Sequence, residues 1–225
     1  GGGKLDPNLE KRFRDQLGVI TFEGYGLTEC SPVVSSNPSD ALRKTGTVGP
    51  ALPGYSAEVR DGEGKPLPPG EEGILWLKGP SVAKGYFRDP EQTAARFRDG
   101  WLNTDDMVRM DGDGYITILD RASDLIIVGG FNVYPQEVET VIKELPGVRE
   151  AVVIGVENPV SGEVPAAFII PDEGADLDAS AVIGYCKEKM AHFKVPRKVT
   201  FVSELPMSAA GKVLKRNLRE QAGRR

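Results

Sequence analysis

The sequence has very little of the chemistry that disulfide frameworks, zinc sites and imidazole-based catalysis require. Among its 225 residues there are two cysteines, Cys30 and Cys186, and a single histidine, His192. The cysteines lie far apart and belong to no CxxC or Cys/His cluster, so neither a disulfide framework nor a zinc site is indicated. We expect both to be buried thiols. A Ser-His-Asp or Cys-His triad would have to use the one imidazole, and we do not expect such a triad.

The sequence also lacks long apolar runs and an excess of basic residues. No apolar run approaches the length of a membrane span, and the N-terminus has no signal-peptide pattern. The formal net charge of -5 argues against nucleic acid as the main partner. With 40% hydrophobic residues, the chain is expected to be a soluble, cytoplasmic protein of one or two domains.

Hydrophobic patterning predicts a helix and a strand in the N-terminal region. Leu9, Phe13 and Leu17 recur every four residues after a proline, which predicts a helix over residues 7–17. Residues 19–23 are predicted to form a buried strand. Such a strand would place Thr28 and Glu29 at its carboxyl edge, where α/β sheets bind ligands.

The pattern of apolar and turn-forming residues then changes twice along the chain. Over residues 45–119, short strands separated by Gly/Pro turns predict a β-rich subdomain. The run 111–114 is predicted to be a hairpin turn, because no glutamate follows at the offset a calcium loop needs. After a boundary at 120–123, interleaved elements predict a compact α+β domain. Its expected helices are 135–145 and 179–190, and its expected strands are 125–128, 151–156, 166–170 and 199–202.

Several residues have side chains suited to binding a nucleotide. Gly211 and Lys212 present an ammonium group after a glycine turn, although a surface lysine is more often only a solvated charge. The ring of Tyr25 could stack on adenine or pack in a core, and Gly24 allows close approach of a ligand. The neighbouring Thr-Glu pair could bind phosphate and Mg²⁺ or could begin a helix.

Five blocks, taken together, carry a family resemblance. They resemble, in order and spacing, the adenylate-forming superfamily of acyl-CoA synthetases, peptide-synthetase adenylation domains and luciferases. The blocks are Tyr25-Gly26-Leu27-Thr28-Glu29, Gly100-Trp101-Leu102-Asn103-Thr104-Asp105-Asp106, Asp120-Arg121-Ala122-Ser123-Asp124, Gly129-Gly130-Phe131-Asn132-Val133-Tyr134-Pro135 and Leu205-Pro206-Met207-Ser208-Ala209-Ala210-Gly211-Lys212-Val213. The segment Gly1-Gly2-Gly3-Lys4-Leu5 is similar to a glycine-rich segment near the family's adenine pocket, although Gly3 and Lys4 depart from that pattern and the run could instead be a plain loop.

The resemblance implies a fold class of α/β and α+β. Residues 1–120 would be the C-terminal part of the large AMP-binding domain, with a strand and a small β-barrel-like subdomain. Residues 121–225 would be a mobile α+β lid domain. Family members are roughly twice this length, and the Ser/Thr/Gly-rich loop that holds the β- and γ-phosphates of ATP is not found between Gly1 and Arg225.

The resemblance also assigns expected roles in a two-step reaction that uses ATP, Mg²⁺ and CoA. Lys212 would bridge the incoming carboxylate and the α-phosphate during formation of acyl-AMP. Thr28 would donate to an α-phosphate oxygen, and Glu29 would hold the metal. Asp106 would accept hydrogen bonds from both ribose hydroxyls. Asp105 stands where the family usually has glycine.

Three further positions are implied in nucleotide binding or in movement of the lid. Arg121 would contact the ribose, or form a structural salt bridge. Gly130 would line a passage for the pantetheine arm, or be only a turn. The pivot would fall at Ser123, where relatives usually carry Asp or Lys.

The resemblance favours a medium- or long-chain fatty acyl-CoA synthetase, and two alternatives remain. One is an adenylation domain that loads a carrier protein; the other is a non-catalytic nucleotide-binding fragment without the triphosphate loop. A basic group could meet the phosphates of CoA or be an ordinary solvated surface. Its members are Lys187, Lys189, Lys194, Arg197 and Lys198.

Overall fold

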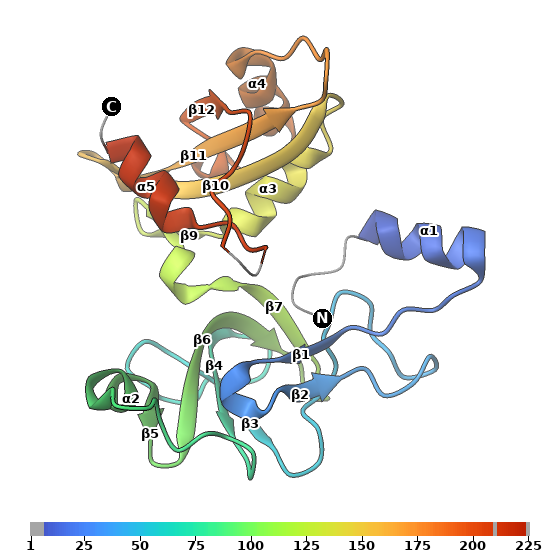
Figure 1. Ribbon diagram of the computed structural model, residues 1–225, viewed down its shortest axis with the longest axis vertical. Helices are drawn as coiled ribbons and strands as arrows, with labels where there is room; N and C mark the ends of the chain where they lie inside the picture. The colour runs from blue at the N-terminus through green and yellow to red at the C-terminus, as the bar shows by residue number, and fades with distance from the viewer. Residues whose placement is uncertain (1–6, 209–210, 224–225) are drawn as a thin grey trace. The chain divides into compact units, whose positions relative to one another are not determined.

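The computed structural model describes residues 7–208 and 211–223, and it divides the chain into two compact units, Gly1–Ala122 and Ser123–Arg225 (Figure 1). The glycine-rich segment 1–5 lies outside the described part, as do residues 209–210 of the block that begins at Leu205. No described helix is long and apolar enough to cross a membrane.

The first unit begins with helix α1 and a short β-ribbon. Helix α1 spans Pro7–Leu17, as predicted. Strand β1 (Gly24–Gly26) pairs antiparallel with β2 (Val33–Ser36), and a 3₁₀ turn, η1 (Thr28–Cys30), lies between them.

The buried strand predicted over residues 19–23 is wrong. The segment has no regular structure, and the side chains of Val19, Ile20 and Phe22 are 48%, 40% and 49% exposed. A strand needs a neighbour to pair its backbone groups, and no ladder between the described strands includes residues 19–23. Its apolar composition alone was therefore a misleading signal.

The β-rich prediction for the rest of this unit is confirmed as an open, five-stranded antiparallel sheet. Its order is β3-β4-β6-β5, and β7 pairs with β6; the described strands form no closed barrel. The bounds are β3 Ser56–Arg60, β4 Glu72–Lys78, β5 Phe97–Arg98, β6 Trp101–Met110 and β7 Ile116–Arg121. Buried side chains on one face, such as Val59, Leu75 and Leu102, form the core.

Helix α2 (Pro90–Arg96) was not predicted, and it precedes β5. It begins with a proline at its first turn and with the Asp89 side chain accepting a hydrogen bond from the Gln92 amide. The predicted hairpin turn between β6 and β7 is confirmed. Asp111 Oδ1 accepts the amides of Asp113 and Tyr115, and Gly114 has a φ of +82°.

The second unit is a five-stranded sheet between helices (Figure 1). Strands β8 (Ile126–Val128), β9 (Phe131–Val133), β10 (Val148–Asn158) and β11 (Gly162–Pro171) run in the order β10-β11-β8-β9, and β12 (Lys198–Phe201) pairs parallel with β11. Helices α3 (Pro135–Lys143) and α4 (Ala179–Lys189) pack in one core, and α5 (Lys215–Gly223) packs in another. The elements predicted after residue 125 are therefore confirmed, with β10 and β11 longer than expected.

Both cysteines are free, buried thiols, as predicted. Burial raises the pKa of each to about 11, and Glu29 adds to the rise at Cys30.

Candidate functional site

The structure brings together three of the predicted residues, Tyr25, Asp106 and Arg121, although they lie far apart in sequence. The Tyr25 hydroxyl donates a hydrogen bond to Asp106 Oδ2. Asp106 on β6 stands directly opposite Arg121 at the end of β7, and the Arg121 Nε lies 3.0 Å from Asp106 Oδ1. One carboxylate therefore holds both a phenol and a guanidinium group.

Burial sets the electrostatics of this carboxylate. Asp106 is 6% exposed, and this burial raises its pKa above the usual value, while the contacts with Tyr25 and Arg121 act in the opposite direction. Burial and the neighbouring carboxylate also raise the pKa of Tyr25, so the phenol stays protonated and acts as a donor. The backbone amide of Asp106 donates to the hydroxyl of Thr104, which is itself fully buried.

Asp105 adopts the conformation expected for the glycine that it replaces in the sequence block. Its φ is +65°, in the left-handed region where L side chains are strained. Its amide donates to the Asn103 side chain at 2.9 Å, a local contact that supports this turn.

Thr28 and Glu29 lie in the 3₁₀ turn directly after β1. Glu29 Oε1 accepts a hydrogen bond of 2.8 Å from the Tyr86 hydroxyl. Among the described residues there is no group of three or more His, Cys, Asp or Glu side chains that could hold a metal. A single carboxylate is nevertheless compatible with Mg²⁺, which commonly takes one or two carboxylates together with substrate phosphates.

The glycines beside Tyr25 are explained by close backbone packing. A Cβ on Gly26 would lie 2.1 Å from the Pro32 carbonyl oxygen, and one on Gly24 would lie 3.0 Å from the Ser35 carbonyl oxygen. Gly26 is therefore required by the β1–β2 ribbon itself.

In the second unit, a tight hairpin presents Lys212. The Lys212 amide donates to Ser208 Oγ at 3.1 Å, the Ser208 amide donates to the Lys212 carbonyl at 2.7 Å, and Gly211 has a φ of +74°. Lys212 is exposed. Ser208 and Lys212 are therefore held to each other by two hydrogen bonds, and Lys212 is open to solvent.

Gly129 and Gly130 form the two-residue turn between β8 and β9. Both have positive φ values, +58° and +88°, which suits a hairpin whose flanking residues Val128 and Phe131 pair. A Cβ on Gly130 would meet no described atom within 4 Å. The turn role is therefore shown, and the space beside Gly130 is open within its own unit.

Two of the basic residues suggested for the phosphates of CoA have a side-chain contact within the second unit. Lys194 Nζ lies 2.6 Å from Glu137 Oε1, so its charge is already paired, and the Arg197 guanidinium lies 3.4 Å from His192 Nδ1. Lys187, Lys189 and Lys198 are exposed. Ser123 is exposed in a 3₁₀ turn, and its neighbour Asp124 pairs with Arg219.

Three residues that were not identified from the sequence support this site: Tyr86, which contacts Glu29; Thr104, whose hydroxyl accepts the Asp106 amide; and Arg96, which donates to the Thr104 carbonyl at 2.9 Å. Thr104 lies inside a recognised sequence block. Tyr86 and Arg96 gave no local signal.

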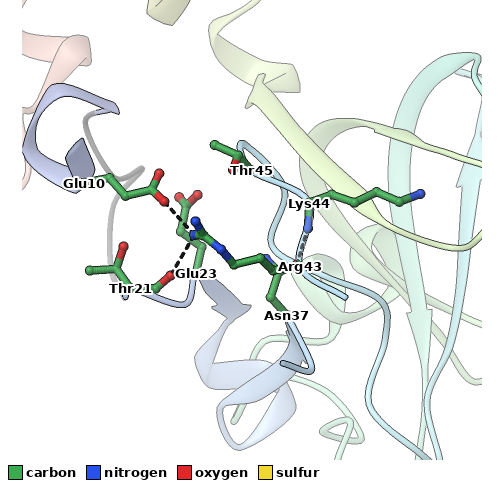
Figure 2. A pocket seen from close by; sticks show the side chains of 7 residues that line it. All are labelled: Glu10, Thr21, Glu23, Asn37, Arg43, Lys44 and Thr45. Atoms are coloured by element: carbon green, nitrogen blue, oxygen red, sulfur yellow. Dashed lines mark hydrogen bonds and ion pairs between the residues drawn. The ribbon is translucent and has the colours of Figure 1, made fainter. Parts of the chain in front are cut away.

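A small polar cavity of about 10 Å³ lies elsewhere in the first unit (Figure 2). Arg43 crosses it and contacts Glu10 Oε1 at 2.6 Å and the Thr21 carbonyl at 3.3 Å. The lining residues are Glu10, Thr21, Glu23, Asn37, Arg43, Lys44 and Thr45. This volume suits about one water molecule, far too little for a nucleotide.

Two family models match the chain. The model for AMP-binding enzymes matches residues 1–87, and the model for the C-terminal domain of AMP-binding enzymes matches residues 137–212.

Curated relatives match almost the whole chain. The long-chain-fatty-acid–CoA ligase of Salmonella typhimurium is 42% identical over 223 residues, which are 99% of this chain and 40% of that protein. The feruloyl-CoA synthase of an Amycolatopsis species is 39% identical, over 99% of this chain and 45% of that protein. The chain thus spans less than half the length of these relatives.

Solved structures of other enzymes are also similar to this chain. ATP-bound MatB from Rhodopseudomonas palustris is 45% identical with a TM-score of 0.88, over 95% of this chain and 43% of that one. The o-succinylbenzoate CoA synthetase of Bacillus subtilis, in complex with its acyl-adenylate intermediate, is 35% identical with a TM-score of 0.88, over 97% of this chain and 45% of that one.

Proposed function

We propose that this chain, which belongs to the adenylate-forming superfamily of AMP-binding enzymes and matches the C-terminal portion of its members, acts in an AMP-forming acid–thiol ligase. In this proposal a carboxylic acid reacts with ATP to give acyl-AMP and pyrophosphate, and the acyl group then passes to the thiol of CoA. The observation that carries the proposal is the buried Asp106 carboxylate held between Tyr25 and Arg121.

The proposed ribose site consists of Asp106 and Arg121. An ionised carboxylate has two oxygens with four lone-pair sites, so it can accept from protein donors and from a diol at the same time. Tyr25 fixes one oxygen and Arg121 the other, which orients the carboxylate before a ligand arrives. Gly24 is exposed next to Tyr25, and we assign the adenine to this side of the ring.

The proposed phosphate site consists of Thr28 and Glu29. The Thr28 hydroxyl would donate to the α-phosphate, and Glu29, oriented by the Tyr86 hydroxyl, would hold the metal. A bound Mg²⁺ would neutralise charge on the phosphates.

The second unit, Ser123–Arg225, is proposed to be the mobile lid. Lys212 would bring its ammonium group to the carboxylate and the α-phosphate in the first step, where two anions must meet. Rotation about Ser123 would then bring Gly130 beside the pantetheine arm for the second step. The hydrogen bonds between Ser208 and Lys212 and the exposure of Lys212 support the first role, and the open space at Gly130 supports the second.

A fatty acid of medium or long chain is the proposed substrate, since several relatives are long-chain-fatty-acid–CoA ligases. Relatives named for other acids, such as ferulate and 2-succinylbenzoate, define the competing substrates. CoA is preferred to a carrier protein because these relatives are named as CoA ligases or CoA synthases. A cytoplasmic location is part of this proposal.

Two measurements on the 225-residue chain test the proposal. Calorimetry should detect binding of AMP that Asp106→Asn weakens, whereas a folded chain that binds neither AMP nor ATP would refute the nucleotide site. Carboxylate-dependent exchange between ATP and labelled pyrophosphate, with short-, medium- and long-chain acids, then separates an active ligase from a non-catalytic nucleotide-binding fragment.

A further inference from the structure

Two acidic residues, Asp105 and Asp106, stand side by side where the proposed function requires a single carboxylate. The Asp105 charge raises the pKa of Asp106, in addition to the larger effect of burial. A second negative charge would also repel the phosphates of a nucleotide. The first unit therefore needs a cation near Asp105 if this arrangement is to bind an anionic ligand.

Arg96, the last residue of helix α2, supplies that cation. Its Nη1 lies 3.8 Å from Asp105 Oδ2, and the two side chains are 25% and 26% exposed. At this burial an ion pair is screened less by water and salt than a pair on the surface. The contact joins α2 to β6 beside Asp106.

The same guanidinium group also fixes the backbone next to Asp106. Arg96 Nη2 donates to the Thr104 carbonyl at 2.9 Å, and Arg121 Nη1 donates to the same oxygen at 3.3 Å. The Thr104 hydroxyl in turn accepts the Asp106 amide. Two arginines therefore restrain the residue that positions the proposed ribose ligand.

The placement of Arg96 leaves one of its own donors without a partner. The Nε of Arg96 is buried and has no hydrogen-bond partner among the described residues. Burying an unsatisfied donor costs free energy, so fold stability alone explains this placement poorly.

We propose that Arg96 is a positioning residue that offsets the Asp105 charge and restrains the Thr104 carbonyl, so that Asp106 can accept the ribose of an adenine nucleotide. The inference rests on the proposed function and goes beyond it, because it makes the nucleotide affinity of this chain depend on the pairing of Arg96 with Asp105.

A rescue experiment on AMP binding tests the inference. Arg96→Met is expected to weaken AMP binding about tenfold, the change that corresponds to loss of one charge-assisted contact. Adding Asp105→Asn, which removes the opposing charge and tolerates positive φ, should restore the affinity to within about threefold of the unaltered chain. Arg98→Met, two residues away and exposed, is the matched control and should leave the affinity unchanged.

A purely structural role for Arg96 predicts no rescue by Asp105→Asn, and this result would overturn the inference. Unchanged AMP affinity in Arg96→Met would overturn it as well. If Arg96→Met does not fold, Arg96→Gln keeps a donor for the Thr104 carbonyl without the charge, and the same rescue is expected.

Carbon-13 NMR titration of the Asp106 carboxyl group separates this inference from the proposed function. If the unaltered chain does not bind AMP, the proposed function fails. The pKa of Asp106 then still tests whether Arg96 offsets the Asp105 charge. Arg96→Met should raise this pKa, and adding Asp105→Asn should lower it again. An Asp106 pKa that Arg96→Met does not move would contradict the compensation itself.

Discussion

The substitution Asp106→Asn is expected to weaken AMP binding while leaving the stability of the protein almost unchanged at neutral pH. It removes the charge of a carboxylate that is 6% exposed and preserves its size. The remaining carbonyl oxygen can accept from Tyr25 or from Arg121, so one of two contacts is lost. A typical hydrogen bond contributes about 1 kcal/mol to stability. Against this loss, the variant no longer has to bury an ionised group.

The raised pKa of Asp106 determines how the relative stability of the Asp106→Asn variant changes with pH. Burial raises the pKa of Asp106 above the 3.8 of the unfolded chain, and the contacts with Tyr25 and Arg121 oppose this rise without cancelling it. A carboxyl group of this kind stabilises the fold fully below the unfolded pKa, and this contribution is lost as the pH rises through the folded pKa. Asparagine makes no such contribution. The free energy of unfolding of the variant, relative to the unaltered chain, should therefore increase from about pH 4 to about pH 7.

Urea denaturation at several pH values measures this difference, with Asp106→Ala as the control. Alanine leaves the buried Tyr25 hydroxyl without its acceptor, so it should cost about 1–3 kcal/mol at pH 7, against less than about 1 kcal/mol for asparagine. The reasoning is refuted if asparagine destabilises the protein as much as alanine. It is also refuted if the relative stability of the asparagine variant falls as the pH rises.

Three further predictions concern other parts of the chain. In the full-length protein, Lys212→Ala should lower adenylation by a factor on the order of 10²–10³ and thioester formation from preformed acyl-AMP much less, as measured by pyrophosphate exchange and single-turnover assays. Gly130→Leu should block thioester formation and also destabilise the turn by roughly 1–3 kcal/mol, because φ is +88° there. Cys30 and Cys186, with pKa values raised to about 11 by burial, should react with a thiol reagent at about pH 8 only after unfolding in urea.

Each of these predictions has an outcome that contradicts it. Equal losses in both half-reactions would show that Lys212 does not act specifically in the formation of acyl-AMP. Gly130→Asn tolerates positive φ better than leucine does but still adds a side chain, so if asparagine leaves thioester formation unaffected, strain in the turn explains the loss in leucine and the passage does not. Rapid thiol labelling of the native chain would show that at least one cysteine is accessible.

Local patterns predicted several elements that are stabilised by their own neighbours in sequence, although the locally capped helix α2 was not predicted. The helix over residues 7–17 and the Asp111 turn follow from proline, apolar spacing and Asx geometry, which act over a few residues. The strand predicted over 19–23 failed because strand formation depends on a pairing partner, which apolar composition does not guarantee.

The same contrast between local signals and long-range contacts applies to the candidate site. Tyr25 and Asp106 were found because each lies in a recognisable block, but their hydrogen bond joins residues 81 positions apart. Tyr86 is 57 positions from Glu29, and Arg96 contacts the site from a helix that was not predicted. Residues that act only through such contacts carry no periodicity or motif, so the sequence could not identify them.

Asp105 and Asp106 break local rules at two successive positions, and function explains this better than folding does. Asp105 adopts a positive φ that glycine would accept without strain. Asp106 buries a charge whose neighbours do not fully offset the effect of burial. Such violations cluster at sites where a ligand supplies what the fold lacks. A ribose diol, which donates two hydrogen bonds to one carboxylate, would supply the missing stabilisation of Asp106, whereas a fold selected for stability alone would carry a neutral residue there.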